Sequence, residues 1–288
     1  MNTDSPNRPS GTENAIFVIK WLNDRGFTVK PGCRLMQMHD LLQNGHHDYH
    51  TPDFWIALES LRDLVELGFI FEQLGGHAAS PKFSAVIKRL LRKDKPLPQD
   101  DRRNSFGRDA HWELYLAAIC QRGAMTPVGF EGNDVTCMVD GTQLGIEAKR
   151  IKSENNAKER IRKAIEQIIK AKRPGVVAVD MSLAWNEHNC PIIEPIHNAL
   201  LDMKLEAQGR QFFHRHKAWI EERCIGKGIL ALLVFNFVMR LREGKWRPHR
   251  HAVWFDLPQT QKESRLYESF KRKFCSVTPN RNDTIEGK

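Results

Sequence analysis

The chain has 288 residues, of which 41% are hydrophobic and 27% charged, and its net charge is +9. The length suffices for one large domain or two smaller ones, and the composition is typical of a globular protein. Six scattered cysteines without a Cys-x-x-Cys pair argue against a zinc ribbon and a disulfide framework, and favour buried thiols in a reducing cytoplasm. The basic balance suggests a polyanionic partner.

A membrane location is not expected. The longest apolar stretch, 229–239, is interrupted by Asn236, is too short to span a bilayer, and predicts a buried strand. Residues 1–13 are polar and lack the apolar segment of a signal peptide. We therefore expect a cytoplasmic protein with no membrane partner, in which residues 1–12 form a disordered leader.

Residues 13–100 are predicted to form a mostly helical region. Apolar residues recur at helical spacing in three segments, over 15–23, over 53–71 and, in a basic helix, over 81–92. The segment 93–101 contains two prolines and is the best candidate for a linker. The loop between the first two helices carries His46, His47 and His50. A metal site is one interpretation of these histidines, and a solvated loop is favoured because they have no cysteine partner.

Residues 101–275 alternate predicted helices and strands, which indicates an α/β domain. The elements are a helix over 106–122, a short strand over 125–130, a hairpin within 133–150, a helix over 156–172, a strand over 175–183, a helical stretch over 192–222, strands over 229–239 and 251–257, and a helix over 260–274. The apolar run over 175–183 is of the kind buried on both faces. We expect residues 276–288 to form a flexible tail.

The hairpin is the most informative segment. Asp140-Gly141 is a strong two-residue turn signal, and with these residues at the tip Val139 faces Thr142. The same register pairs Val135 with Ile146 and Cys137 with Leu144, which places the apolar residues on one face. Asp134 then lies opposite Glu147, with Lys149 on the same charged face. Like charges directly opposite each other are destabilising, so a divalent cation is expected to offset this cost.

The order helix, three strands, helix, strand from residue 106 resembles the core of the PD-(D/E)xK nuclease superfamily, the restriction-endonuclease-like fold. In that family the second strand supplies an Asp, the third supplies a Glu/Asp-x-Lys, and the preceding helix often supplies a Glu. Asp134, the triplet Glu147-Ala148-Lys149 and Glu113 occupy these positions here. The resemblance covers 105–183, and Gly132-Asn133 stands where the family often has a proline. It implies an αβββαβ core with a central mixed sheet flanked by helices, preceded here by the helical region 13–100.

Asp134 and Glu147 are the expected ligands of Mg²⁺ or Mn²⁺, because such hard cations prefer carboxylate oxygens. The family resemblance implies that the backbone carbonyl of Ala148 also contributes. Lys149 is expected to stabilise charge on the phosphate, since a lysine among carboxylates stays protonated. Glu113 lies on a small, apolar helix face. It is interpreted either as a further metal-site carboxylate or as a partly exposed glutamate favoured by the helix dipole.

From Lys149 to Arg173 there are ten Lys or Arg against three Glu. This density suits phosphate contacts, and a solvated helix face is the alternative. The expected nucleic-acid contacts are Arg150, Lys152, Lys158, Arg162 and Lys163. On this helix Ile161, Ile165, Ile168 and Ile169 are expected to face inward, and Gln167 is a further site candidate. The basic segment 247–251, with tryptophans nearby, is interpreted either as part of a nucleic-acid groove or as edge-strand charge.

The sequence therefore predicts a divalent-metal-dependent nuclease, with DNA as the favoured substrate and endonucleolytic cleavage as the favoured mode. Restriction, phage defence and repair would all suit such an enzyme. The first alternative is a non-catalytic nucleic-acid-binding or interaction protein with the same fold. The second is a surface hairpin with a charged outer face, which is common in antiparallel sheets. The Glu-x-Lys triplet alone is a weak signal, because two further triplets, 243–245 and 286–288, occur without the hairpin context. The helical region is expected to bind DNA or a partner, or to form a homodimer.

Overall fold

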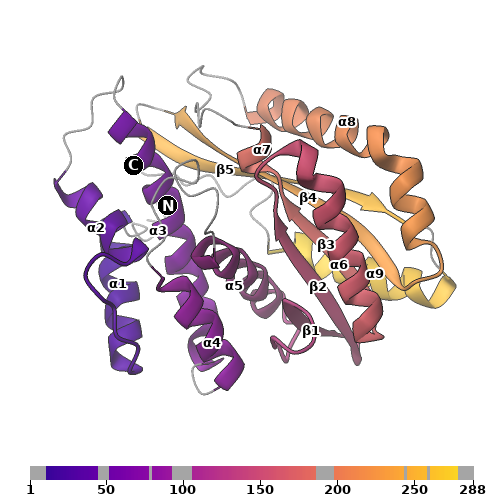
Figure 1. The fold of residues 1–288 in the computed structure, drawn as a ribbon, viewed down its shortest axis with the longest axis horizontal. Coiled ribbons are helices and arrows are strands. Elements are labelled where there is room, and N and C mark those ends of the chain that lie inside the picture. Colours follow the sequence, from indigo (N-terminus) through magenta and orange to yellow (C-terminus); the bar gives the residue numbers. More distant parts are fainter. Residues whose placement is uncertain are drawn as a thin grey trace, which may run out of the picture.

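A computed structural model describes residues 11–44, 52–77, 80–92, 106–185, 198–242, 245–257 and 260–277. The predicted histidine loop, the linker 93–101, most of the leader and most of the tail lie outside these ranges. Within the described residues, every helix is either too short or too polar to cross a membrane. The chain forms a mixed α/β structure around one five-stranded sheet (Figure 1).

The sheet has the strand order β1-β2-β3-β4-β5 and mixed direction. Its strands are β1 (Val135–Val139), β2 (Thr142–Arg150), β3 (Gly175–Asp180), β4 (Ile229–Arg242) and β5 (Lys245–Asp256). The two outer pairs, β1 with β2 and β4 with β5, are antiparallel, whereas β3 runs parallel to both its neighbours. The apolar run predicted at 229–239 is therefore a buried strand, as its composition indicated.

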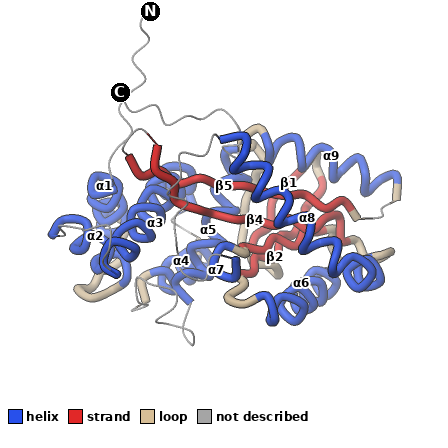
Figure 2. Tube along the Cα trace, turned by 90° about the horizontal axis from the view of Figure 1, so that it is seen from above, coloured by secondary structure: helices blue, strands red, loops and turns tan. Residues whose placement is uncertain are grey.

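Helices cover both faces of the sheet. The helices of this part are α5 (Phe106–Arg122), α6 (Ala157–Ala171), α7 (Ser182–Trp185), α8 (Asn198–Cys224) and α9 (Gln261–Cys275), with a 3-10 turn at Glu154–Asn156. Figure 2 shows α9 and α6 on opposite sides of the strands. Alternate residues of β3 divide between the two layers: Val176 and Ala178 join the core that contains α5, and Val177 and Val179 join the core that contains α6. This is the alternation expected of a strand buried on both faces.

The N-terminal region is helical, as predicted, and contains one helix more than expected. It consists of α1 (Gly11–Asp24), α2 (Arg34–Asn44), α3 (Pro52–Leu74) and α4 (Pro81–Leu90), with a 3-10 turn at Gly75–His77. The missed helix α2 buries only Leu35 and Met38 as apolar residues, so its periodic signal is short. These helices share one continuous apolar core with α5 and with β1. The N-terminal region is thus packed onto the sheet rather than held apart from it.

The hairpin register agrees with the prediction. Val135 pairs with Ile146, Cys137 with Leu144 and Val139 with Thr142, and Asp140 and Gly141 both have positive φ at the turn. The apolar partners fixed this register because a shift by one residue would have turned them away from α5. The cysteines that the structure describes are all free thiols, and four of the five are buried.

Three local predictions were wrong. The strand expected over 125–130 is reduced to a single bridge between Gly129 and Thr136. Pro127, in the middle of this segment, has no backbone N–H and cannot donate a hydrogen bond to a neighbouring strand. The strand over 175–183 ends at Asp180, because Ser182 begins the short helix α7. Ile169 was expected in the core and is 40% exposed. Ile169 follows Ile168 on the last turn of α6, and its side chain lies outside the stripe of buried residues on this helix.

Candidate functional site

The predicted carboxylates and lysine form one cluster at the end of the hairpin. Lys149 Nζ lies 2.6 Å from Asp134 Oδ2 and 2.8 Å from Glu147 Oε2. Asp134 Oδ2 also accepts a hydrogen bond from the backbone N–H of Ala148, at 2.9 Å. The protein itself therefore places a positive charge, the ammonium of Lys149, next to both carboxylates.

The backbone of β2 turns Ala148 toward the same cluster. Gly145 and Ile151 donate their N–H groups toward β3, at Pro174 and Asp180, whereas Ala148 donates to Asp134 on the other side. The N–H and C=O groups of one strand residue point toward the same neighbour. The carbonyl of Ala148 therefore also faces the side on which Asp134 lies, as the predicted ligand set requires.

Glu147 is fully buried. Burial raises its pKa to about 7, and Asp134 adds to this rise, against the lowering effect of Lys149 and Asn133. The reverse balance holds for Lys149: burial lowers its pKa, but Asp134 and Glu147 outweigh burial and the net shift is upward. Lys149 thus stays protonated. Because Glu147 has no exposed surface, the alternative of a solvated charged face on the hairpin is wrong.

Asn133 holds Glu147 from the side opposite Lys149. Its Nδ2 donates to Glu147 Oε1 at 2.8 Å, so each carboxylate oxygen of Glu147 has a separate partner. Asn133 fits there only because Gly145 has no side chain: a Cβ at Gly145 would lie 2.4 Å from Asn133 Oδ1. Sequence reasoning noted Asn133 as a replacement for proline and did not assign it this role.

Glu113 is also buried, and its partner comes from the N-terminal region. Arg89, on the last turn of α4, donates two hydrogen bonds to the two carboxylate oxygens of Glu113, at 2.9 and 2.5 Å. Burial raises the pKa of Glu113 to about 7, and Asp134 contributes to the rise against Arg89 and Lys149. The mutual influence of Asp134 and Glu113 places α5 within electrostatic reach of the hairpin cluster. The interpretation of Glu113 as a partly exposed helix residue is therefore wrong.

The donor types of this cluster are those that a hard divalent cation prefers. Asp134, Glu147 and Glu113 carry carboxylates and Ala148 a backbone carbonyl, although the ligand atoms of the three carboxylates do not all lie within 4.8 Å of one another. Magnesium and manganese take such oxygen ligands. Two of the carboxylates have raised pKa values, partly because Asp134 repels additional negative charge. A bound cation would relieve that repulsion, so the residues present are compatible with the expected Mg²⁺ or Mn²⁺.

The predicted nucleic-acid contacts differ in their exposure and in their partners. Arg150 points inward: its Nε lies 2.9 Å from Asp180 Oδ2, and its side chain is 14% exposed. Arg162 and Lys163 lie on the surface of α6 but form ion pairs with Glu159, and Arg162 also pairs with Glu166. Lys158 is exposed and faces the ring of Trp219 at 6.0 Å. Lys152 is partly exposed and Gln167 is exposed.

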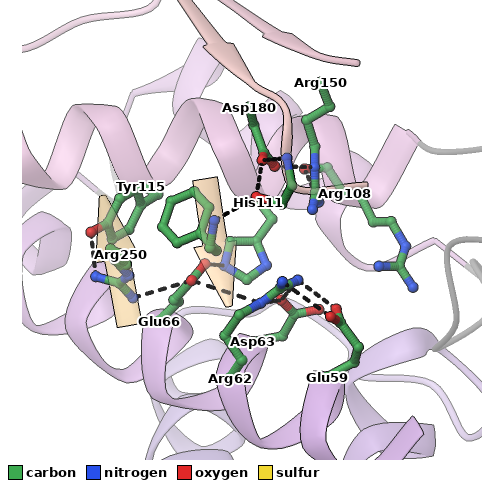
Figure 3. A network of polar contacts seen from close by, with 12 residues as sticks. Glu59, Arg62, Asp63, Glu66, Arg108, His111, Tyr115, Arg150, Asp180 and Arg250 are labelled. Carbon is green, nitrogen blue, oxygen red and sulfur yellow. Dashed lines mark hydrogen bonds and ion pairs between the residues drawn. The ribbon is translucent and has the colours of Figure 1, made fainter. Parts of the chain in front are cut away.

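A second polar cluster is buried between α3 and α5 (Figure 3). Asp63, Glu66 and His111 each place a ligand atom within 4.8 Å of the others, which is close enough to hold a metal ion. Their charges are already matched by arginines: Arg34 and Arg62 pair with Asp63, and Arg250 lies 3.1 Å from Glu66. A metal ion would have to displace these guanidinium groups.

Arg250 belongs to the basic segment 247–251, which was interpreted either as part of a nucleic-acid groove or as edge-strand charge. It donates a hydrogen bond to the hydroxyl of Tyr115 and stacks 4.3 Å from the centre of that ring. With Glu66, it ties β5 to α3 and α5. The neighbouring His251 bridges Asp202 and Glu206 of α8, at 3.2 and 2.9 Å. These side chains thus join elements of the fold, which favours a structural interpretation of the segment.

Comparisons of the chain with protein-family models, with curated proteins and with solved structures found no match.

Proposed function

We propose that this protein is a divalent-metal-dependent nuclease with a restriction-endonuclease-like core, and that DNA cut internally is its substrate. The observation that carries the proposal is the position of Lys149 Nζ, 2.6 Å from Asp134 and 2.8 Å from Glu147, at one end of a hairpin. Burying a lysine and two carboxylates costs desolvation free energy, and a buried ion pair often adds little net stability. Such a cluster is therefore a candidate for a chemical role, and metal-assisted phosphodiester hydrolysis is one that uses these groups.

The order of elements supports the same proposal. Helix α5, the bridge at Gly129, strands β1 and β2, helix α6 and strand β3 follow one another in the αβββαβ order of that fold. Strand β3 lies parallel to β2, as a crossover through α6 requires. The first strand is reduced to one bridge. Fold alone does not define activity, so the proposal depends on the carboxylate and lysine cluster.

Each residue of the cluster has a role in this chemistry. Asp134, Glu147 and the carbonyl of Ala148 would hold Mg²⁺ or Mn²⁺, with Glu113 as a further carboxylate. When bound, such an ion supplies a polarised phosphate and a more acidic water. Lys149 stays protonated and stabilises negative charge on the phosphate. Asn133 keeps Glu147 oriented, and Arg89 does the same for Glu113.

The surface of α6 would hold the phosphate backbone beside this cluster. Lys158, Arg160 and Lys170 are exposed on α6, and none of them has an ion pair within the described part of the chain. Arg162 and Lys163 would have to leave Glu159 to bind phosphate. We therefore expect the three unpaired side chains to contribute more to DNA affinity than the two paired ones.

Cleavage of circular and linear DNA with Mg²⁺, with Mn²⁺ and with a chelator tests the proposal. The wild type should nick and linearise circles only when metal is present, and a Glu147→Gln variant should leave them intact. Binding of DNA without cleavage in every metal condition would favour the alternative, a non-catalytic nucleic-acid-binding protein with this fold. Absence of both binding and cleavage would remove the support for either function.

A further inference from the structure

A second concave site lies at the opposite end of β2 from Lys149. It is a pocket of about 730 Å³, bounded by the hairpin tip, the end of α6, the starts of β3 and β4, and the first turns of α9. Thr142 lines it, and Lys149 is seven residues further along the same strand. At roughly 3.3 Å per residue, the pocket and the carboxylate cluster are about 20 Å apart. The pocket therefore belongs to neither the carboxylate cluster nor the buried network.

The rim of the pocket is strongly basic. Five cationic side chains line it, namely Lys172, Arg173, Lys227, Lys262 and Arg265. None of these five has an ion-pair partner among the described residues. This contrasts with α6, where Arg162 and Lys163 are neutralised by acidic neighbours. Five cations without an ion-pair partner in the described part of the chain therefore surround one hollow.

The two acidic side chains of the lining are already engaged. Glu263 accepts hydrogen bonds from the backbone N–H and the hydroxyl of Thr260, at 2.8 and 2.7 Å, in the capping box of α9. Asp140 lies 2.9 Å from the ammonium of Lys273. Neither carboxylate forms an ion pair with any of the five cations, and five positive against two negative charges leave the lining with a net charge of +3. The pocket therefore favours an anion with more than one negative charge.

Apolar side chains also line the pocket. They are those of Val139, Ile168, Ile169, Pro174 and Leu266. Ile169 is the side chain expected in the core and found 40% exposed, so part of its apolar surface is open to a ligand. Apolar and cationic side chains around one pocket suit a ligand with a flat, weakly polar ring at one end and phosphate groups at the other.

We propose that this pocket binds a nucleotide, with the base against Ile169 and Leu266 and the phosphates at the cationic rim. Its volume lies within the range of small-ligand pockets, roughly 300–1,000 Å³. Arginine and lysine are the side chains that recognise phosphate. The site goes beyond the proposed nuclease activity and does not depend on it.

Calorimetric titration of the full chain with ATP, in the presence of a chelator, tests the proposal. The chelator removes metal from the carboxylate cluster, so failure of the nuclease proposal would not affect the result. A double variant, Lys262→Glu with Arg265→Glu, reverses two exposed charges of the rim. Losing even one charge-assisted contact should weaken ATP binding roughly tenfold or more. Lys204→Glu reverses an exposed charge on α8 outside the pocket and should leave the affinity unchanged.

Four results would overturn the proposal. The first is a wild type that does not bind ATP at millimolar concentration, and the second is equal binding by the double variant. The third is inorganic triphosphate binding as tightly as ATP, which would show that the apolar side chains of the lining take no part. The fourth is binding of a short single-stranded oligonucleotide in place of ATP, lost in the double variant. That result would make the pocket an anchor for a nucleic-acid strand.

Discussion

Arg89 on α4 and Glu113 on α5 form a two-hydrogen-bond ion pair, with N···O distances of 2.9 and 2.5 Å, between the N-terminal helices and the proposed catalytic cluster. The side chain of Arg89 is 36% exposed and that of Glu113 only 7%. The arginine can therefore be reached from solvent while it holds a buried carboxylate. Through this pair the N-terminal region takes part in the geometry of the site.

Arg89→Ala should reduce DNA cleavage without abolishing folding. The change leaves the Glu113 carboxylate buried near Asp134 with no guanidinium partner, at a cost of about 1–3 kcal/mol. We expect single-turnover cleavage to fall at least roughly tenfold. Lys88→Ala is the matched control, because it removes the same charge from the same turn at an exposed position. Equal cleavage by wild type and Arg89→Ala would show that the pair serves only to pack α4 on α5.

Gly145→Ala should disturb Glu147 through Asn133. The new Cβ would lie 2.4 Å from Asn133 Oδ1, so Asn133 must move and its hydrogen bond to Glu147 is lost. Asn133→Ala removes the same hydrogen bond without adding an atom at residue 145. The two variants should lose similar shares of activity, on the order of 1.5–3 kcal/mol in activation free energy.

Gly76→Ala provides the control for backbone effects, since a Cβ there meets nothing within 4 Å. Its cleavage rate and melting temperature should match those of the wild type. A Gly145→Ala protein that cuts as fast as Gly76→Ala would contradict the role given to Asn133.

Acidification should destabilise the protein through His111. Burial lowers the pKa of His111 from 6.5 to about 4, against the raising effect of Glu66. The unfolded chain therefore binds a proton between pH 6.5 and about 4 that the folded protein does not, so stability falls as the pH falls through this window. The lost stability is of the order of 3 kcal/mol.

Glu66 extends the loss to lower pH. Burial alone would raise its pKa, but Arg250, His111 and Arg62 outweigh burial and hold it well below its usual value. Its stabilising contribution is present above pH 4.5 and disappears as the pH falls further. Thermal unfolding of wild type and His111→Gln from pH 7 to 4 measures the effect of the histidine. The melting temperature of the variant should depend less on pH; parallel curves would show that His111 does not titrate in this way.

Arg150 and Arg160 should behave differently although both are basic residues at the start of the same segment. Arg150→Gln leaves Asp180 buried without its guanidinium, so the melting temperature should drop while the salt dependence of DNA binding stays the same. Arg160→Gln should leave the melting temperature unchanged and reduce the salt slope of binding by about one phosphate contact. Salt titrations of DNA affinity with both variants decide this. A reduced slope for Arg150→Gln would restore Arg150 as a phosphate contact.

Much of the sheet and of the carboxylate cluster was predictable from local pattern. Asp140-Gly141 and the apolar pairs of the hairpin determined the register, and the register brought Asp134 to Glu147. The partners Arg89 and Asn133 were not predictable in the same way. Arg89 lies 24 residues before Glu113 on a helix whose basic residues all look alike in sequence. Which of them meets a carboxylate depends on how α4 packs against α5, and no periodicity encodes that.

The charges of the basic segment also needed the structure. Arg150 and Arg162 were both predicted to contact phosphate. In the structure Arg150 pairs with Asp180, and Arg162 pairs with Glu159 and Glu166. Ile169 shows the converse case, an apolar residue at helical spacing that falls just outside the buried stripe. For Arg150 the deciding partner comes from another strand, whereas Arg162 is held by glutamates of its own helix.

The most direct test of the central claim is single-turnover cleavage of supercoiled DNA with Mg²⁺ by wild type and Lys149→Ala, with folding of both confirmed by circular dichroism. If Lys149 stabilises charge on the scissile phosphate, its removal should lower the rate roughly 10²–10³-fold while the protein remains folded. A folded Lys149→Ala protein that cuts DNA at the wild-type rate would contradict the proposed mechanism.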